Sequence, residues 1–362
     1  MSEDGNTGED PTNRASHHTW HHNEGMTQIS CPVRARVWRD GRVIATEVAG
    51  ADISDHIGDP TTLVWVDLEN PSPEDLSALA DELGLAATAV EDALAPYERP
   101  KVTRHADHLF FTTYATAFRN GAATGRPGDP AGRLVLGRVS GFVLPAALVT
   151  IRTDDHFDLG AVLLRWDENA DLLRNGPGAL LHGLLDEVVD QQFETIQALD
   201  DAIEGLEDEL FEESGGGREF LRSVYGVRKD LVRLRRVVLP MREVVNGLLR
   251  HRPESDEELA RWYDDLYDHV LRAAEWTESL RDMVTTIVET NLSQQDTRLN
   301  TVMKQLAAWA AIIAVPTAVT GWFGQNVPYP GFGQPSGVWV SVGLIAVLSG
   351  SLYAIFRRRD WL

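Results

Sequence analysis

A long stretch without charge near the C-terminus constrains the fold of this chain more than any other feature. No Asp, Glu, Lys or Arg occurs from residue 305 to residue 356, although these four residue types make up 24% of the chain. Two apolar runs, Leu306 to Phe323 and Val338 to Phe356, lie inside this stretch. Each has about the 17 to 25 residues that an α-helix needs to cross a bilayer. We predict a transmembrane hairpin; the alternative is a buried hairpin in a soluble protein.

Basic residues predict how this hairpin is oriented. Arg298 and Lys304 precede the first run, and three arginines at 357–359 follow the second, whereas the loop at 324–337 has no Lys or Arg. By the positive-inside rule, both termini lie in the cytoplasm. Residues 1–28 are polar and lack the apolar segment of a signal peptide. We therefore expect a multi-pass protein of the cell inner or plasma membrane, with everything before residue 305 in the cytoplasm.

The part before the hairpin is acidic and has one cysteine. The whole chain has a formal net charge of −22, which disfavours nucleic acid as a partner and favours cations. Cys31 cannot form an internal disulfide, which suits a reducing compartment. We predict that residues 1–28 form a disordered tail. Its His-rich tract, His17 to His22, either binds a transition metal loosely or is a solvated segment without a role.

Residues 29–181 predict a cytoplasmic α/β domain. Ser72 and Pro73 are suited to the N-cap and the first position of a helix that follows one of the strands. Alternating or continuous apolar runs predict strands at 33–38, 42–46, 63–68, 109–114, 141–144 and 147–151. Together these segments form a plausible sheet with its own core.

Residues 182–304 predict a helical stalk. Apolar residues three or four apart indicate an acidic helix up to the glycines at 215–217, and a basic helix follows to about residue 250. From Asp256 to Trp322 no cluster of turn residues interrupts the helical pattern, so this helix would be about 100 Å long. Such a helix needs neighbours along its length, which predicts an oligomer around an axis. The expected fold is an α+β membrane protein: an N-terminal cytoplasmic α/β domain, a long stalk, and two C-terminal transmembrane helices within 305–362.

Small and weakly polar residues recur on one side of the first membrane helix. This side could pack against the second helix, or it could line a water-filled path in a ring of identical helices. Both interpretations remain open from composition. Gly324 and Asn326 are likewise common at helix ends, because both tolerate a left-handed backbone. The recurring residues are Asn300, Met303, Ala307, Ala310, Ala314, Thr317, Gly321 and Gly324.

These motifs together resemble the CorA family of divalent-cation transporters, the two-helix GxN membrane proteins. Gly324-Gln325-Asn326 is similar to the Gly-Met-Asn signature after the first span, and Asn300 to Leu306 resembles Asn-x-Val-Met-Lys-x-Leu. The resemblance runs from residue 33 to residue 362 in one order. Further matching segments are Val90 to Leu94, Glu98 to Val102, Pro240 to Val244, Tyr267 to His269, and Arg357 to Leu362.

The resemblance implies a homopentamer in the lipid bilayer that transports a divalent cation, Mg²⁺ by default, through a central pore. Asn326, with Gly324 and Gln325, would form the pore mouth. Asp92 would hold a regulatory Mg²⁺ with Glu289 of the neighbouring subunit and so keep the pore shut. No other cofactor is implied. The residues implied to line the path are Asn300, Met303, Leu306, Thr317 and Gly321.

Departures from the family pattern leave the transported ion open. Gln325 replaces Met, the outer loop has no acidic residue, and Ala314 lies near a position where many members have a bulky gate. Co²⁺, Ni²⁺ or Zn²⁺, with or without proton coupling, are alternatives to Mg²⁺. A second hypothesis is a membrane scaffold or metal sensor that does not conduct. An enzyme is not expected, because the sequence has no phosphate-binding glycine loop, His-Glu metal motif or nucleophile motif. His105 and His108 are expected in a polar turn before a strand.

Overall fold

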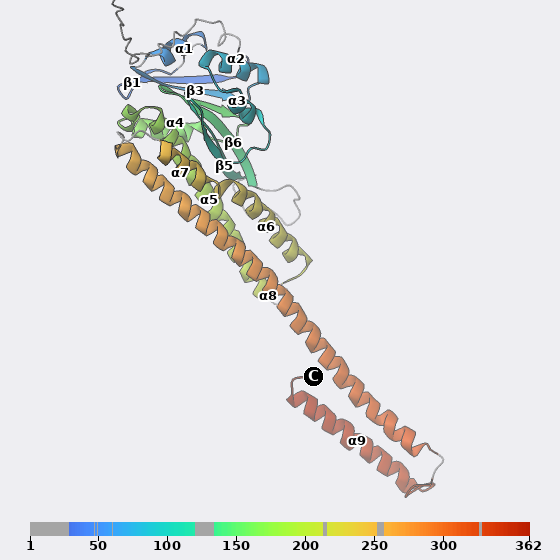
Figure 1. Ribbon diagram of the computed structural model, residues 1–362. Coiled ribbons are helices and arrows are strands. Elements are labelled where there is room, and N and C mark those ends of the chain that lie inside the picture. Colours follow the sequence, from blue (N-terminus) through green and yellow to red (C-terminus); the bar gives the residue numbers. More distant parts are fainter. Residues whose placement is uncertain are drawn as a thin grey trace, which may run out of the picture. The chain divides into compact units, whose positions relative to one another are not determined.

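The computed structural model describes residues 29–46, 48, 50–59, 61–119, 134–212, 216–251, 257–325 and 328–362. The predicted disordered tail, its His-rich tract and Asn326 lie outside these ranges. The N-terminal part is a seven-stranded sheet with helices on both faces (Figure 1), which confirms the expected α/β fold. The strands are β1 (Val33–Arg39), β2 (Arg42–Ala45), β3 (Thr62–Glu69), β4 (Lys101–Arg104), β5 (Leu109–Phe118), β6 (Leu134–Val143) and β7 (Ala147–Arg152).

The strands follow the order β2-β1-β3-β7-β6-β5-β4. β3 and β7 run parallel, and the other neighbouring pairs in this sheet are antiparallel. Each predicted strand overlaps an observed one, but β5 extends beyond the predicted 109–114 and most of β6 lies before the predicted 141–144. The four-residue strand β4 was not predicted. β4 is short and follows Pro100, so it has too few residues to show an alternating pattern.

Side chains that alternate along the strands pack into two separate hydrophobic cores, one on each face of the sheet. In β3, Val64 and Val66 pack on the side of α1 (Gly50–Gly58), α2 (Pro73–Leu83) and α3 (Ala87–Leu94). Trp65 points to the opposite core, which contains Trp166 of α4 (Leu159–Glu168). This period of two follows from strand geometry and produces three layers, as Figure 1 shows.

The start of α2 is fixed by its cap, as predicted. The Asp75 backbone N–H donates to Ser72 Oγ (3.1 Å), and the Ser72 backbone N–H donates to Asp75 Oδ2 (2.9 Å). Pro73 occupies the first turn, where its missing N–H costs no hydrogen bond. This reciprocal pair is a capping box, so the prediction for Ser72 and Pro73 is confirmed.

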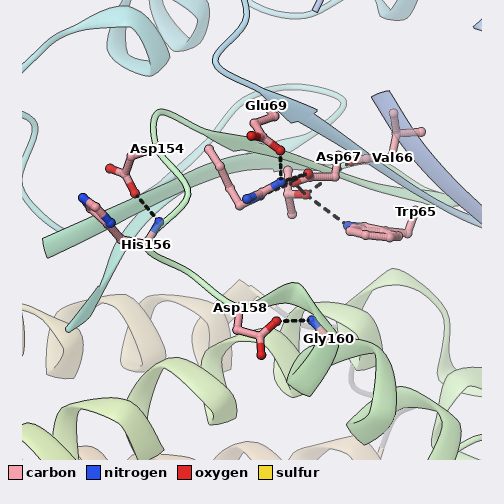
Figure 2. A network of polar contacts seen from close by, with 10 residues as sticks. Trp65, Val66, Asp67, Glu69, Asp154, His156, Asp158 and Gly160 are labelled. Atoms are coloured by element: carbon pink, nitrogen blue, oxygen red, sulfur yellow. Dashed lines mark hydrogen bonds and ion pairs between the residues drawn. The ribbon is translucent and has the colours of Figure 1, made fainter. Parts of the chain in front are cut away.

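A buried ion pair joins the parallel strands β3 and β7 (Figure 2). Arg152 Nη2 lies 2.8 Å from Asp67 Oδ2 and 3.0 Å from Glu69 Oε2. Thr150 donates its hydroxyl to Asp67 Oδ1 (2.7 Å) and accepts from Trp65 Nε1 (3.1 Å). Asp67 and Arg152 are both buried. Removing one partner would leave an uncompensated charge in the core and destabilise the packing of the two strands.

Four further helical segments follow the sheet: a short 3₁₀ helix, η3 (Leu172–Asn175), then α5 (Pro177–Phe211), α6 (Arg218–Val238) and α7 (Met241–His251). The sequence predicted one basic helix from 218 to about 250, and this prediction is wrong. The helix breaks at Pro240, which has no N–H to donate and whose ring would clash with the preceding turn. Its carbonyl instead accepts from the Glu243 and Val244 N–H groups at the start of α7 (2.9 and 3.1 Å).

The chain divides into two compact units. One consists of Met1–Leu206 and Leu221–Asp282, and the other of Glu207–Phe220 and Met283–Leu362. α8 (Glu257–Phe323) contributes to both, and its 67 residues confirm the predicted long helix. The second unit also holds α9 (Pro335–Arg358). α7 and the first turns of α8 share a core with the sheet, through Val244, Val245 and Leu266.

Candidate pore face and metal site

The apolar segments of α8 and α9 are largely uncovered. Each contains an 18-residue window apolar enough to cross a membrane, and these windows are 11% and 0% buried. A core helix of a soluble protein would have most of its apolar side chains covered. The alternative of a buried hairpin in a soluble protein therefore does not fit this structure.

The covered side of α8 within the second unit is marked by two residues. Ala308 and Val319 are 0% and 7% exposed. They are eleven residues apart, about three turns, and so share one face. Successive residues of an α-helix are rotated by about 100°, and this rotation places the stripe of small and weakly polar residues on the opposite face. Its members are exposed: Asn300, Met303, Ala307, Ala310, Ala314, Thr317, Gly321 and Gly324. The stripe is therefore not the face that packs within this unit.

Large apolar residues continue the same face toward the N-terminal side. Leu292, Leu299, Met303 and Leu306 are separated by seven, four and three residues, and each is more than half exposed. Apolar side chains in such a row are typical of a helix that packs against other helices. We call this row together with the small-residue stripe the open face of α8.

Between residues 300 and 324, the polar atoms on the open face are few and uncharged. Thr317 donates its hydroxyl to the Ile313 carbonyl (3.3 Å) and keeps lone pairs on its exposed side. The Asn300 side chain is also exposed, 17 residues nearer the stalk, or about 25 Å along the helix. Uncharged oxygens can contact an ion without holding it tightly, which suits a path for ions.

An aromatic cluster closes the end of α8. The helix ends at Phe323, and the Gly324 N–H still donates to the Thr320 carbonyl (2.8 Å). The Tyr329 hydroxyl donates to the Phe323 carbonyl (3.1 Å), and its ring lies 5.0 Å from the Phe323 ring and 5.3 Å from the Phe332 ring. Gln325 is exposed next to this cluster. The sequence interpretation did not single out Tyr329, although an aromatic residue between two prolines was a usable signal.

The second candidate feature surrounds Asp92 on α3. Its carboxylate Oδ2 lies 2.7 Å from Lys101 Nζ, and Lys101 Nζ also lies 3.1 Å from Glu98 Oε1. Burial alone would lower the pKa of Lys101, but the hydrogen bonds that its ammonium donates to Asp92 and Glu98 outweigh it and raise the pKa above its ordinary value. Lys101 is therefore a charged ammonium between two carboxylates. The sequence motif contained Glu98 and Lys101, but their contact with Asp92 could not be predicted without the fold.

The predicted partner Glu289 lies on α8 in the second unit and is exposed. The resemblance placed it opposite Asp92 of a neighbouring subunit, so a single chain does not test the pair. No group of three or more His, Cys, Asp or Glu residues suited to a metal occurs among the described residues. The carboxylate oxygens of Asp92 and Glu98 are ligands of the kind that Mg²⁺ prefers.

Comparison with known proteins decides the family. The family described as "CorA-like Mg2+ transporter protein" matches residues 60–358. The chain belongs to this family. Its members are metal-ion transporters rather than enzymes, and they carry two C-terminal apolar helices in the membrane.

Similar proteins cover nearly the whole CorA-like chain. The cobalt/magnesium transport protein CorA of Methanocaldococcus jannaschii is 26% identical over 90% of this chain and 98% of its own length. The complete structure of that magnesium transporter superposes with a TM-score of 0.70 at 25% identity, and covers 91% of this chain and 98% of its own. The zinc transport protein ZntB of Yersinia pestis is 27% identical over 85% of this chain and 90% of its own length.

Proposed function

We propose that this CorA-like chain conducts a divalent cation, Mg²⁺ by default, across the cell membrane through a homopentameric pore. Both termini lie in the cytoplasm, as the basic residues at the inner ends of the spans indicate. The observation that carries the proposal is the open face of α8, which is exposed and opposite to the covered Ala308 and Val319. Five copies of α8 around an axis would turn this face toward the axis, where it would line a path for ions.

The mouth of the pore follows from the chemistry of the Gly324-Gln325-Asn326 loop. Mg²⁺ loses its water shell reluctantly, so a selective site reads the hydrated ion. A ring of neutral amide oxygens from Asn326 can accept hydrogen bonds from that water without trapping the ion. Below the mouth, the ion would pass Gly321 and Thr317, then Leu306, Met303 and Asn300.

Regulation by cytoplasmic Mg²⁺ would act at Asp92. Next to it, Leu94 and Tyr97 are exposed, Tyr97 to 96%. Exposed apolar side chains beside a charged cluster suit a subunit boundary, with Glu289 of the neighbouring subunit supplying a further carboxylate. Without a bound cation the carboxylates of the two subunits repel one another, whereas Mg²⁺ between them would join the subunits. Such a site biases the pore toward its closed state.

Zinc is the second candidate cargo. The similarity to a protein named as a zinc transporter favours it. The flux of Mg²⁺, Co²⁺, Ni²⁺ and Zn²⁺ into proteoliposomes, measured with and without a pH gradient, identifies the transported cation and tests for proton coupling. We expect Mg²⁺ flux that Asn326→Ala abolishes while assembly is kept. Near-normal flux in that variant would show that the loop only caps α8, and no flux of any cation would favour a non-conducting sensor.

A further inference from the structure

Lys101 occupies the place of a cation between two carboxylates. Its ammonium lies 2.7 Å from Asp92 Oδ2 and 3.1 Å from Glu98 Oε1. The three side chains come from α3, from the loop after it and from β4, so they converge only in the folded domain. They retain 31%, 20% and 22% of their exposure for Asp92, Glu98 and Lys101, which leaves the cluster open to ions from solution.

The backbone around this cluster is fixed by two other residues. The buried Arg138 donates to the carbonyl of Ala93 in the last turn of α3 and to that of Ala95, the C-cap of this helix. The Tyr114 hydroxyl donates to the Glu98 carbonyl. Lys101 itself pairs with Thr112 in the β4–β5 ladder. The backbone that carries the two carboxylates is thus held independently of the lysine, so we expect it to stay in place when the charge of Lys101 is removed.

One ammonium cannot neutralise two carboxylates, and the cluster keeps a net negative charge. A divalent cation would match that charge and accept oxygen ligands from both side chains. We propose that Lys101 is a built-in counter-ion that a divalent cation must displace from Asp92 and Glu98, and that it thereby weakens the regulatory site. Glu98 is then a ligand in addition to Asp92. This inference rests on the proposed regulation at Asp92.

The test is Mg²⁺ titration of the purified full-length protein by calorimetry, with protease resistance as a second readout. Lys101→Met removes the charge but keeps the apolar stem, and we expect it to raise the apparent Mg²⁺ affinity about tenfold, as loss of two partly exposed ion pairs implies. Lys101→Arg keeps the charge and should remain within about twofold of wild type. Arg39→Met is the matched control, because it removes the same charge from a pair with Asp59 (3.0 Å) elsewhere in the sheet domain.

Adding Glu98→Gln or Asp92→Asn to Lys101→Met should abolish the gain. An unchanged midpoint in Lys101→Met, with Asp92-dependent binding in wild type, would overturn the counter-ion role but leave the proposed regulation intact. Binding in Lys101→Met but not in wild type would support the counter-ion role and overturn regulation by Mg²⁺. An equal gain in Arg39→Met would overturn the role as well, because general charge would explain it.

Discussion

At the scale of single residues, the turn between β4 and β5 carries a pH-sensitive contact. His108 is buried, accepts a hydrogen bond at Nε2 from the Ala86 N–H (3.5 Å) and stacks on His105 with ring centroids 4.8 Å apart. Burial, and then the charge of His105, lower the pKa of His108 below its ordinary value of 6.5. The unfolded chain therefore binds the proton first as pH falls below 6.5, and the native state loses stability there. We expect the melting temperature of His108→Gln to fall less than that of wild type between pH 7.5 and 5.5, and equal falls would contradict this.

The same turn shows what the sequence could and could not reveal about single residues. The His105 N–H donates to the His108 carbonyl (2.9 Å), which confirms the predicted turn. Ser72 was also predictable, because a cap depends on residues three positions apart. The contact of Lys101 with Asp92 was not, because it joins a helix to a strand that the sequence pattern did not reveal.

At the scale of elements, the close approach of α7 to β4 positions the strand that carries Lys101. A Cβ added at Gly247 would lie 2.4 Å from Val102 Cγ1, and a valine has little freedom to move aside. We expect Gly247→Ala to lower the free energy of unfolding by about 1 to 3 kcal/mol through overpacking. The same substitution at Gly226 in α6, where nothing lies within 4 Å, should raise it by about 0.5 to 1 kcal/mol. Denaturant unfolding compares the two, and a matching gain at both positions would contradict the close contact.

Helices were more predictable than their ends and breaks. The absence of a cluster of turn residues between Asp256 and Trp322 was enough to predict the length of α8, and the structure confirms it. The break at Pro240 was missed because apolar periodicity continues on both sides of it, whereas the missing N–H acts only locally. The open face of α8 could be proposed from spacing, but choosing it over a packing face needed the burial of Ala308 and Val319.

At the scale of the whole molecule, one chain leaves the open face of α8 without a partner in its own unit. Leu292, Leu299 and Leu306 would remain in water or lipid along a helix of about 100 Å. We predict a homopentamer, so the mass of the detergent-purified protein should be five times the 40.1 kDa of one chain. Mass photometry or light scattering corrected for detergent measures it. A monomer or dimer that still transports would contradict this assembly.

The central claim is that the open face of α8 lines the path for ions. The most direct test compares Mg²⁺ flux into proteoliposomes between two variants, each with one substitution in one of the two spans. Ala314 lies on the open face of α8, and Ala346 is exposed on α9. In a pentamer, Ala314→Phe would place five phenylalanine rings at one level of the pore. We therefore predict that flux falls at least about tenfold, as expected where side chains line the conduction path. Ala346→Phe, on the outer helix, should keep flux within about twofold, because an apolar ring is tolerated in lipid. Equal flux in both variants at equal reconstitution would contradict a path along this face.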